Sequence, residues 1–67
     1  MQLMINGESK QVREAMTVAQ LLEQLSVQPH RVVVEVNLTI LKRAQYADVV
    51  LKDGDRVEIV QFVGGGS

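Results

Sequence analysis

Hydrophobic and polar positions alternate at the start of the chain, which is typical of a half-buried β-strand. Residues 2–5 form the first predicted strand, with Leu3 and Ile5 on one face. Asn6-Gly7 follows, and both residue types tolerate the positive φ angles of a type I′ turn. A returning and more exposed strand is expected over residues 9–14. The chain is therefore predicted to open with an antiparallel hairpin.

The pattern then changes to a helical period. Thr17 and Gln20 have the spacing of a capping box, in which each side chain accepts a hydrogen bond from the other residue's backbone N–H. Apolar residues recur with the spacing of one helix face, and they are Val18, Leu21, Leu22 and Leu25. Pro29 cannot continue a helix. One amphipathic helix is predicted from residue 17, ending over residues 26–30.

Three strands are expected in the second half of the chain. Residues 31–36 are rich in β-branched valines and suit a central strand. Residues 37–42 predict a short turn and strand centred on Ile40, and residues 56–62 predict the last strand. The order of elements favours a two-layer α+β domain.

The segment between the last two strands is expected to hold a brief helical turn over residues 43–50. Tyr46, Val49 and Val50 are its candidate core residues. Asp53-Gly54 predicts another hairpin-type turn before the last strand.

The compact arrangement of these elements is the β-grasp, or ubiquitin-like, fold: a mixed sheet of four to five strands with one main helix on one face. In it the first and last strands are parallel neighbours at the centre of the sheet, joined by a right-handed crossover that includes the helix. Residues 1–63 are assigned to this domain, and residues 64–67 to a flexible glycine tail.

Alternation in the last strand separates two apolar pairs. Val57 and Ile59 share one face, and Val60 and Phe62 share the other. Two interpretations of Phe62 stay open: a core residue that faces the helix, or an exposed aromatic anchor in a docking patch. Arg43, next to Lys42, is either a solvated basic residue or part of the same contact.

Composition excludes several classes of function. The 67-residue chain has no cysteine, so it has no thiol nucleophile. Its net charge is −1 with both signs interspersed, so it has no basic stripe for nucleic acid. No apolar run is long enough to span a bilayer. Residues 1–5 lack the charged start and the small-residue cleavage site of a signal peptide, so a cytoplasmic monomer is expected. His30 is the single histidine, and one ligand makes no metal site. No catalytic residues and no metal site are expected.

The tail is the remaining candidate for chemistry. Gly64, Gly65 and Gly66 have no side chains to bury, and Ser67 follows them. Such a segment is either a probe that enters a narrow channel in a partner or an uninformative end, since its composition is also that of artificial linkers.

The chain resembles the ThiS family of thiamine-pathway sulfur carriers. The resemblance runs from residue 1 to residue 66. It is carried by Met1-Gln2-Leu3-x-Ile5-Asn6-Gly7, Thr17-Val18-x-x-Leu21-Leu22-x-x-Leu25, Val36-Asn37, Ile40-Leu41-x-Arg43, Leu51-x-Asp53-Gly54-Asp55-x-Val57-Glu58-Ile59-Val60 and the glycine end. At Lys42 the family often has proline.

The resemblance implies a carrier that is a co-substrate and not an enzyme. It implies that a ThiF-like partner adenylates the C-terminal glycine, using ATP and magnesium that this chain does not itself bind. Persulfide sulfur from a cysteine desulfurase then gives a thiocarboxylate, which supplies sulfur to thiazole synthase.

Carried over by position, the resemblance places the reactive carbonyl at Gly66, with Gly64 and Gly65 threading into the partner. Val60, Phe62 and Arg43 are the expected docking residues. Family members typically end at the second glycine, so removal of Ser67 is expected before activation. Two alternatives stay open: a molybdopterin-synthase-type carrier and a ubiquitin-like interaction module without chemistry.

Overall fold

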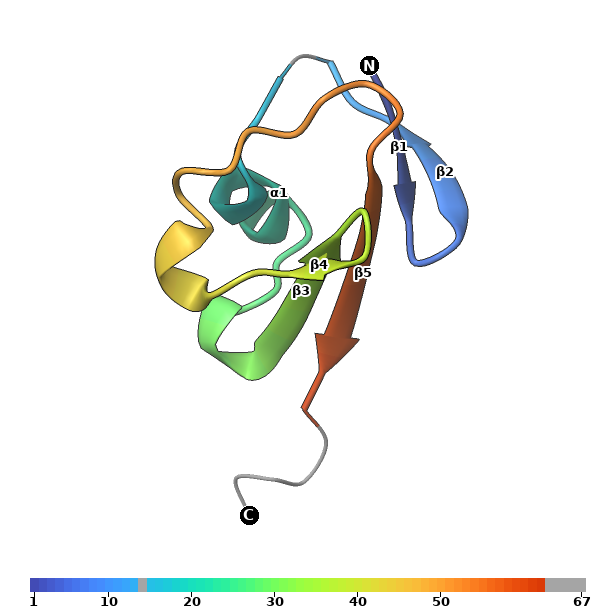
Figure 1. Ribbon diagram of the computed structural model, residues 1–67. Coiled ribbons are helices and arrows are strands. Elements are labelled where there is room, and N and C mark those ends of the chain that lie inside the picture. The colour runs from blue at the N-terminus through green and yellow to red at the C-terminus, as the bar shows by residue number, and fades with distance from the viewer. Residues whose placement is uncertain (14, 63–67) are drawn as a thin grey trace.

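The computed structural model describes residues 1–13 and 15–62. Along the chain it contains the hairpin strands β1 and β2, helix α1, the short strands β3 and β4 and the last strand β5 (Figure 1). Their bounds are β1 Gln2–Ile5, β2 Glu8–Gln11, α1 Val18–Gln24, β3 Val32–Val36, β4 Thr39–Ile40 and β5 Arg56–Gln61, with 3-10 turns η1 Pro29–Arg31 and η2 Arg43–Gln45.

All strands belong to one five-stranded sheet in the order β2-β1-β5-β3-β4. β1 and β5 are parallel, whereas β1–β2, β3–β4 and β3–β5 are antiparallel. Helix α1 packs on one face of the sheet, which we call the inner face (Figure 1). The predicted β-grasp arrangement is confirmed, including the parallel pairing of the first and last strands.

The opening hairpin turns at Asn6-Gly7 as predicted, but its second strand begins and ends earlier than predicted. Asn6 and Gly7 both have positive φ angles, 51° and 82°, as the type I′ turn requires. Because this turn is only two residues long, pairing resumes at once with Ile5 opposite Glu8. The predicted strand over residues 9–14 is therefore wrong in its bounds, and β2 is Glu8–Gln11, with every residue exposed.

Helix α1 has both hydrogen bonds of the predicted capping box. The backbone N–H of Gln20 donates to Thr17 Oγ1 at 3.1 Å, and the backbone N–H of Thr17 donates to Gln20 Oε1 at 2.8 Å. Val18, Leu21 and Leu22 are buried, whereas Leu25 is 36% exposed at the end of the helix. The apolar face of α1 thus covers the sheet over three of its four predicted positions.

The core lies between α1 and the inner face. Its buried apolar residues are Leu3, Ile5, Val18, Leu21, Leu22, Val32, Val34, Tyr46, Leu51 and Val57. These residues are mainly aliphatic, and Tyr46 is the one aromatic member. Burial of their side chains is the main stabilising contribution to a domain of this size.

Two local predictions after β4 need correction. Val50 is 54% exposed, and Leu51, the next residue, is fully buried in its place. The reason is that residues 49–51 run in extended conformation beside Met16 and Val18, with hydrogen bonds from Val18 to Val49 and from Leu51 to Met16, so side chains alternate. The Asp53-Gly54 turn is present, but it leads into β5 and does not join two paired strands.

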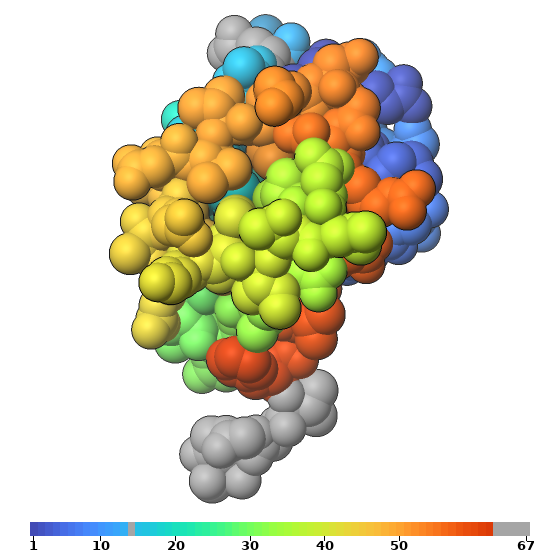
Figure 2. All heavy atoms as spheres, viewed as in Figure 1, coloured from blue at the N-terminus to red at the C-terminus, as the bar shows by residue number. Residues whose placement is uncertain are grey.

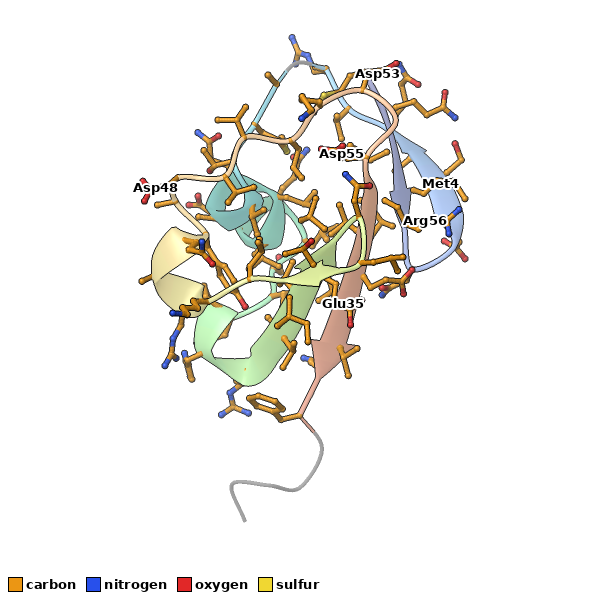
Figure 3. The ribbon with its side chains drawn as sticks, viewed as in Figure 1. Met4, Glu35, Asp48, Asp53, Asp55 and Arg56 are labelled. Atoms are coloured by element: carbon orange, nitrogen blue, oxygen red, sulfur yellow. The ribbon has the colours of Figure 1, made fainter. Side chains whose placement is uncertain are left out.

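A buried carboxylate fixes the start of β5. Asp55 is 7% exposed and lies under the turn that precedes β5 (Figure 3). It accepts hydrogen bonds from the side chain of Asn37 at 3.0 Å and from the backbone N–H of Lys52 at 2.8 Å. Asn37 in turn accepts from the backbone N–H of Arg56 at 2.9 Å, so the β3–β4 turn is tied to β5.

Candidate functional site: the outer sheet face and the end of β5

Strand β5 is the last element that the structure describes. It runs toward the end of the molecule opposite the N-terminus (Figure 1). Its pairing with β3 reaches Gln61 opposite Val32, and the Phe62 N–H donates to the Arg31 carbonyl at 2.9 Å. The backbone is therefore fixed by the sheet up to Phe62. Gly64, Gly65, Gly66 and Ser67 lie outside the described residues.

Alternation along β5 places two apolar residues on the face opposite α1, which we call the outer face. Val57 is fully buried and Ile59 is half-buried against the core, whereas Val60 and Phe62 are 58% and 59% exposed. The core interpretation of Phe62 is therefore wrong. The last two outer-face positions before the tail are both apolar and both accessible.

Neighbouring strands extend this apolar surface. Val60 is paired with Val33, which is half-buried, and Ile40 on β4 is paired with Glu35 and is 65% exposed. We call Val33, Ile40, Val60 and Phe62 the outer patch. In the space-filling view the red end of β5 adjoins the yellow-green surface of β3 and β4 on this face (Figure 2).

A shallow hollow of about 220 Å³ adjoins the outer patch. Arg43 and Phe62 both line it, together with Ile40 and the buried Tyr46. Two of the three docking residues expected from the sequence, Arg43 and Phe62, therefore meet at one hollow. Val60 lies on the same face but does not line this hollow.

Two glutamates lie opposite each other on the same face. Glu35 on β3 pairs with Glu58 on β5, and both side chains are half-buried. Like charges directly opposite in a sheet are destabilising. Neither glutamate was expected at the site from the sequence, although the alternation of Glu35 with Val34 and Val36 was a signal that Glu35 faces outward.

No group of three or more histidine, cysteine, aspartate or glutamate side chains in residues 1–13 and 15–62 is placed to hold a metal ion. His30 is exposed in the turn η1, as expected for a loop histidine. Across the same residues, no helix is both long and apolar enough to cross a membrane.

Comparison with known proteins identifies the family. The family model described as ThiS matches residues 3–66. A sulfur carrier protein ThiS from Escherichia coli is 33% identical over 98% of this chain and 100% of its own length. The crystal structure of the thiamine biosynthesis protein ThiS from Geobacter metallireducens superposes with a TM-score of 0.86 at 40% identity, covering 98% of this chain and 100% of that one.

A thiazole synthase from Paramagnetospirillum magneticum is 49% identical over all of this chain. The chain spans only 21% of the length of that relative, so the likeness concerns one segment of a larger protein. The family match over residues 3–66, the full-length carrier relative and the shared fold agree. The chain belongs to the ThiS family, which includes the sulfur carrier protein ThiS of Escherichia coli.

Proposed function

We propose that the carbonyl carbon of Gly66 is the atom that carries sulfur. The observation that supports this assignment best is that the family match extends through the glycine run to residue 66. The part of the chain that the structure describes ends in a strand whose last residues face solvent. Glycines suit a reactive end, because without Cβ atoms a partner's backbone can approach closely.

The chemistry starts from a carboxylate, which is ionised at neutral pH and is a poor electrophile. A ThiF-like adenylating enzyme would hold ATP and magnesium and join the Gly66 carboxylate oxygen to the α-phosphate, with pyrophosphate as the leaving group. The terminal sulfur of a persulfide then attacks the carbonyl and expels AMP. A second thiol cleaves the resulting acyl disulfide, which leaves a thiocarboxylate on Gly66 and a disulfide on the donor.

Ser67 follows Gly66, so the Gly66 carbonyl is in a peptide bond in this sequence. An amide is not a substrate for adenylation, because it has no free carboxylate oxygen. We therefore propose that the Gly66–Ser67 bond is hydrolysed before activation. Gly64 and Gly65 would then lie in the partner's channel and place the Gly66 carboxylate at the reacting groups.

Binding energy must come from the folded domain. Ordering each glycine costs roughly 1–2 kcal/mol, and glycine buries no side chain in return. The outer patch and Arg43 are the proposed docking surface, with Val60 and Phe62 as anchors. A partner that also presents a cation to Glu35 and Glu58 would relieve their mutual repulsion.

Thiazole synthase is the proposed acceptor of the sulfur. The likeness of this whole chain to a segment of a thiazole synthase from Paramagnetospirillum magneticum supports that pairing. A cysteine desulfurase is the proposed source of the persulfide. The chain would act throughout as a co-substrate, with no cofactor of its own.

The test uses the chain truncated after Gly66, incubated with ATP, magnesium and the ThiF-like enzyme from the same genome. We expect pyrophosphate release that depends on the carrier, whereas the chain that keeps Ser67 releases none. Replacing Gly66 by a residue with a side chain, Gly66→Val, is the matched variant and should lower the rate strongly. Absence of pyrophosphate release from the truncated chain would favour an interaction module without chemistry.

A further inference from the structure

The last residues of strand β5 have one edge that is not paired with another described strand. The N–H of Phe62 donates to the carbonyl of Arg31, and the carbonyl of Arg56 accepts from the N–H of Asn37, so the bonds join β5 to the two residues that flank β3. Residues 56, 58, 60 and 62 therefore direct their backbone polar groups toward β3. The carbonyl of Val57 instead accepts from the Asn6 N–H at 2.9 Å. Residues 57, 59 and 61 therefore direct theirs toward β1.

Strand β1 is too short to pair with all of them. Its ladder with β5 ends where Ile5 is opposite Val57. The side chain of Asn6 then substitutes for a strand residue: its Oδ1 accepts from the Ile59 N–H at 2.7 Å, and its Nδ2 donates to the Ile59 carbonyl at 3.2 Å. Gln61 is two residues further and lies beyond both β1 and Asn6.

A groove of about 390 Å³ lies along this edge. Its apolar lining comes from Ile5, Leu25, Val27 and Ile59, and Gln61 lies on its border. Leu25, the helix-stripe residue that does not reach the core, is 36% exposed beside this groove. The hairpin contributes Glu8 and Lys10, one charge of each sign, at the other side. An apolar floor next to an open strand edge is the combination that an added β-strand uses.

We propose that this groove binds an extended segment of the adenylating enzyme, which adds to the sheet beside β5 by pairing with the backbone of Gln61. The inference rests on the proposed function, because it names how the activating partner holds the chain. Gly66 is five residues beyond Gln61, a reach of roughly 17 Å for an extended chain. Pairing at Gln61 would fix the direction in which that segment leaves the domain.

The occupant is a peptide backbone because Gln61 offers one N–H donor and one carbonyl acceptor, the pair that a neighbouring strand satisfies. Its side chains on the groove side should alternate, with an apolar residue over Val27 and Ile59. The outer patch lies on the opposite face of the sheet, so both surfaces could contact one partner that surrounds the end of β5.

Amide hydrogen exchange of the 15N-labelled chain, with and without the adenylating enzyme and without ATP, tests the proposal directly. In the free protein the Gln61 amide should exchange fast and the Phe62 amide slowly, since Phe62 is bonded to Arg31. Saturating enzyme should slow Gln61 at least about tenfold, the factor expected for one well-formed hydrogen bond. Gln61 exchange that is unchanged in the complex would overturn the proposal.

A pair of substitutions gives an independent readout. Gln61→Pro removes the N–H that we propose pairs with the partner, whereas Gln61→Ala keeps it. We expect the KM for the carrier in pyrophosphate release to be about tenfold higher for Gln61→Pro than for Gln61→Ala. Equal KM values for the two variants would contradict backbone pairing at this position.

The two proposals fail in different ways. A truncated chain that binds the enzyme and protects Gln61 but releases no pyrophosphate would contradict the adenylation of Gly66 and leave the groove assignment intact. Normal pyrophosphate release without protection of Gln61 would contradict the groove alone. If Gln61→Pro loses its native circular dichroism, the exchange measurement on the unmodified sequence decides.

Discussion

At the scale of single residues, Phe62 combines an exposed aromatic side chain with a backbone that is held by the sheet. It is aromatic, and its side chain is 59% exposed, although the backbone around it is fixed by the hydrogen bond to Arg31. A rigid exposed aromatic next to a tail is the kind of anchor that carries a large share of interface energy.

Phe62→Ala should therefore separate binding from stability. Truncation of an anchor costs about 2 kcal/mol of binding free energy, so we expect the Kd for the adenylating enzyme to rise roughly thirtyfold. The free energy of unfolding should change by less than about 0.5 kcal/mol, because the side chain is exposed. Calorimetric titration and urea unfolding measure the two quantities. A variant that loses stability but keeps the original Kd would contradict the anchor role of Phe62.

Leu38 has a strained backbone conformation that substitution by glycine would relieve. It follows Asn37 in the β3–β4 turn with a φ angle of 73°, and its side chain is 79% exposed. A side chain in this region costs roughly 1–2 kcal/mol, and glycine loses about 0.5–1 kcal/mol through its freedom in the unfolded chain.

Leu38→Gly should consequently raise the free energy of unfolding by roughly 0.5–1 kcal/mol, since it relieves the strain and removes little buried surface. Thermal unfolding measures the gain, and Asn37→Gly is an informative comparison because it also removes the contacts of Asn37 with Asp55 and Arg56. A lower melting temperature for Leu38→Gly would show that Leu38 makes stabilising contacts.

At the scale of elements, the capping box determines where α1 begins. Thr17→Ala removes the acceptor for the Gln20 N–H and should cost about 1 kcal/mol. In a domain of this length that loss corresponds to a melting temperature lower by roughly 4–8 °C. Thr17→Ser keeps the acceptor and should remain close to the original protein. Equal losses in the two variants would assign the role to the methyl group and not to the hydrogen bond.

Elements with a strong local signal were predictable from the sequence. Alternation of apolar and polar residues predicted β1, β3 and the faces of β5. The 3.6-residue period of apolar residues, with the capping box before it, predicted α1. The turn η1 at Pro29–Arg31 was not predicted, because three residues show no period. Val50 was misplaced because its exposure is set by an extended segment that runs beside Thr17, which is distant in the sequence.

In the candidate site, too, some features follow from local sequence patterns and others from contacts between residues that are distant in the sequence. Exposure of Val60 and Phe62 follows from alternation once the inner face is known. The opposition of Glu35 and Glu58 depends on the register between β3 and β5, which local patterns do not specify. The groove beside Gln61 depends on an Asn6 side chain that bonds to a residue 53 positions away. Such long-range contacts follow from the tertiary fold.

At the scale of the whole molecule, the folded domain and the proposed chemistry occupy different parts of the chain. Deleting Gly65, Gly66 and Ser67 removes no residue of the core. We expect the melting temperature to change by no more than about 2 °C and sulfur transfer to thiazole synthase to be lost completely. Differential scanning calorimetry and a thiazole-forming assay measure the two effects. A large drop in melting temperature would mean that these residues stabilise the domain.

We have proposed that sulfur is carried on the carbonyl carbon of Gly66. Fragmentation mass spectrometry of the carrier isolated from its native cell tests it most directly, because it locates the exchange of oxygen for sulfur on a particular residue. We expect a chain that ends at Gly66 with a thiocarboxylate on that residue. A thiocarboxylate on a chain that still ends in Ser67 would contradict it.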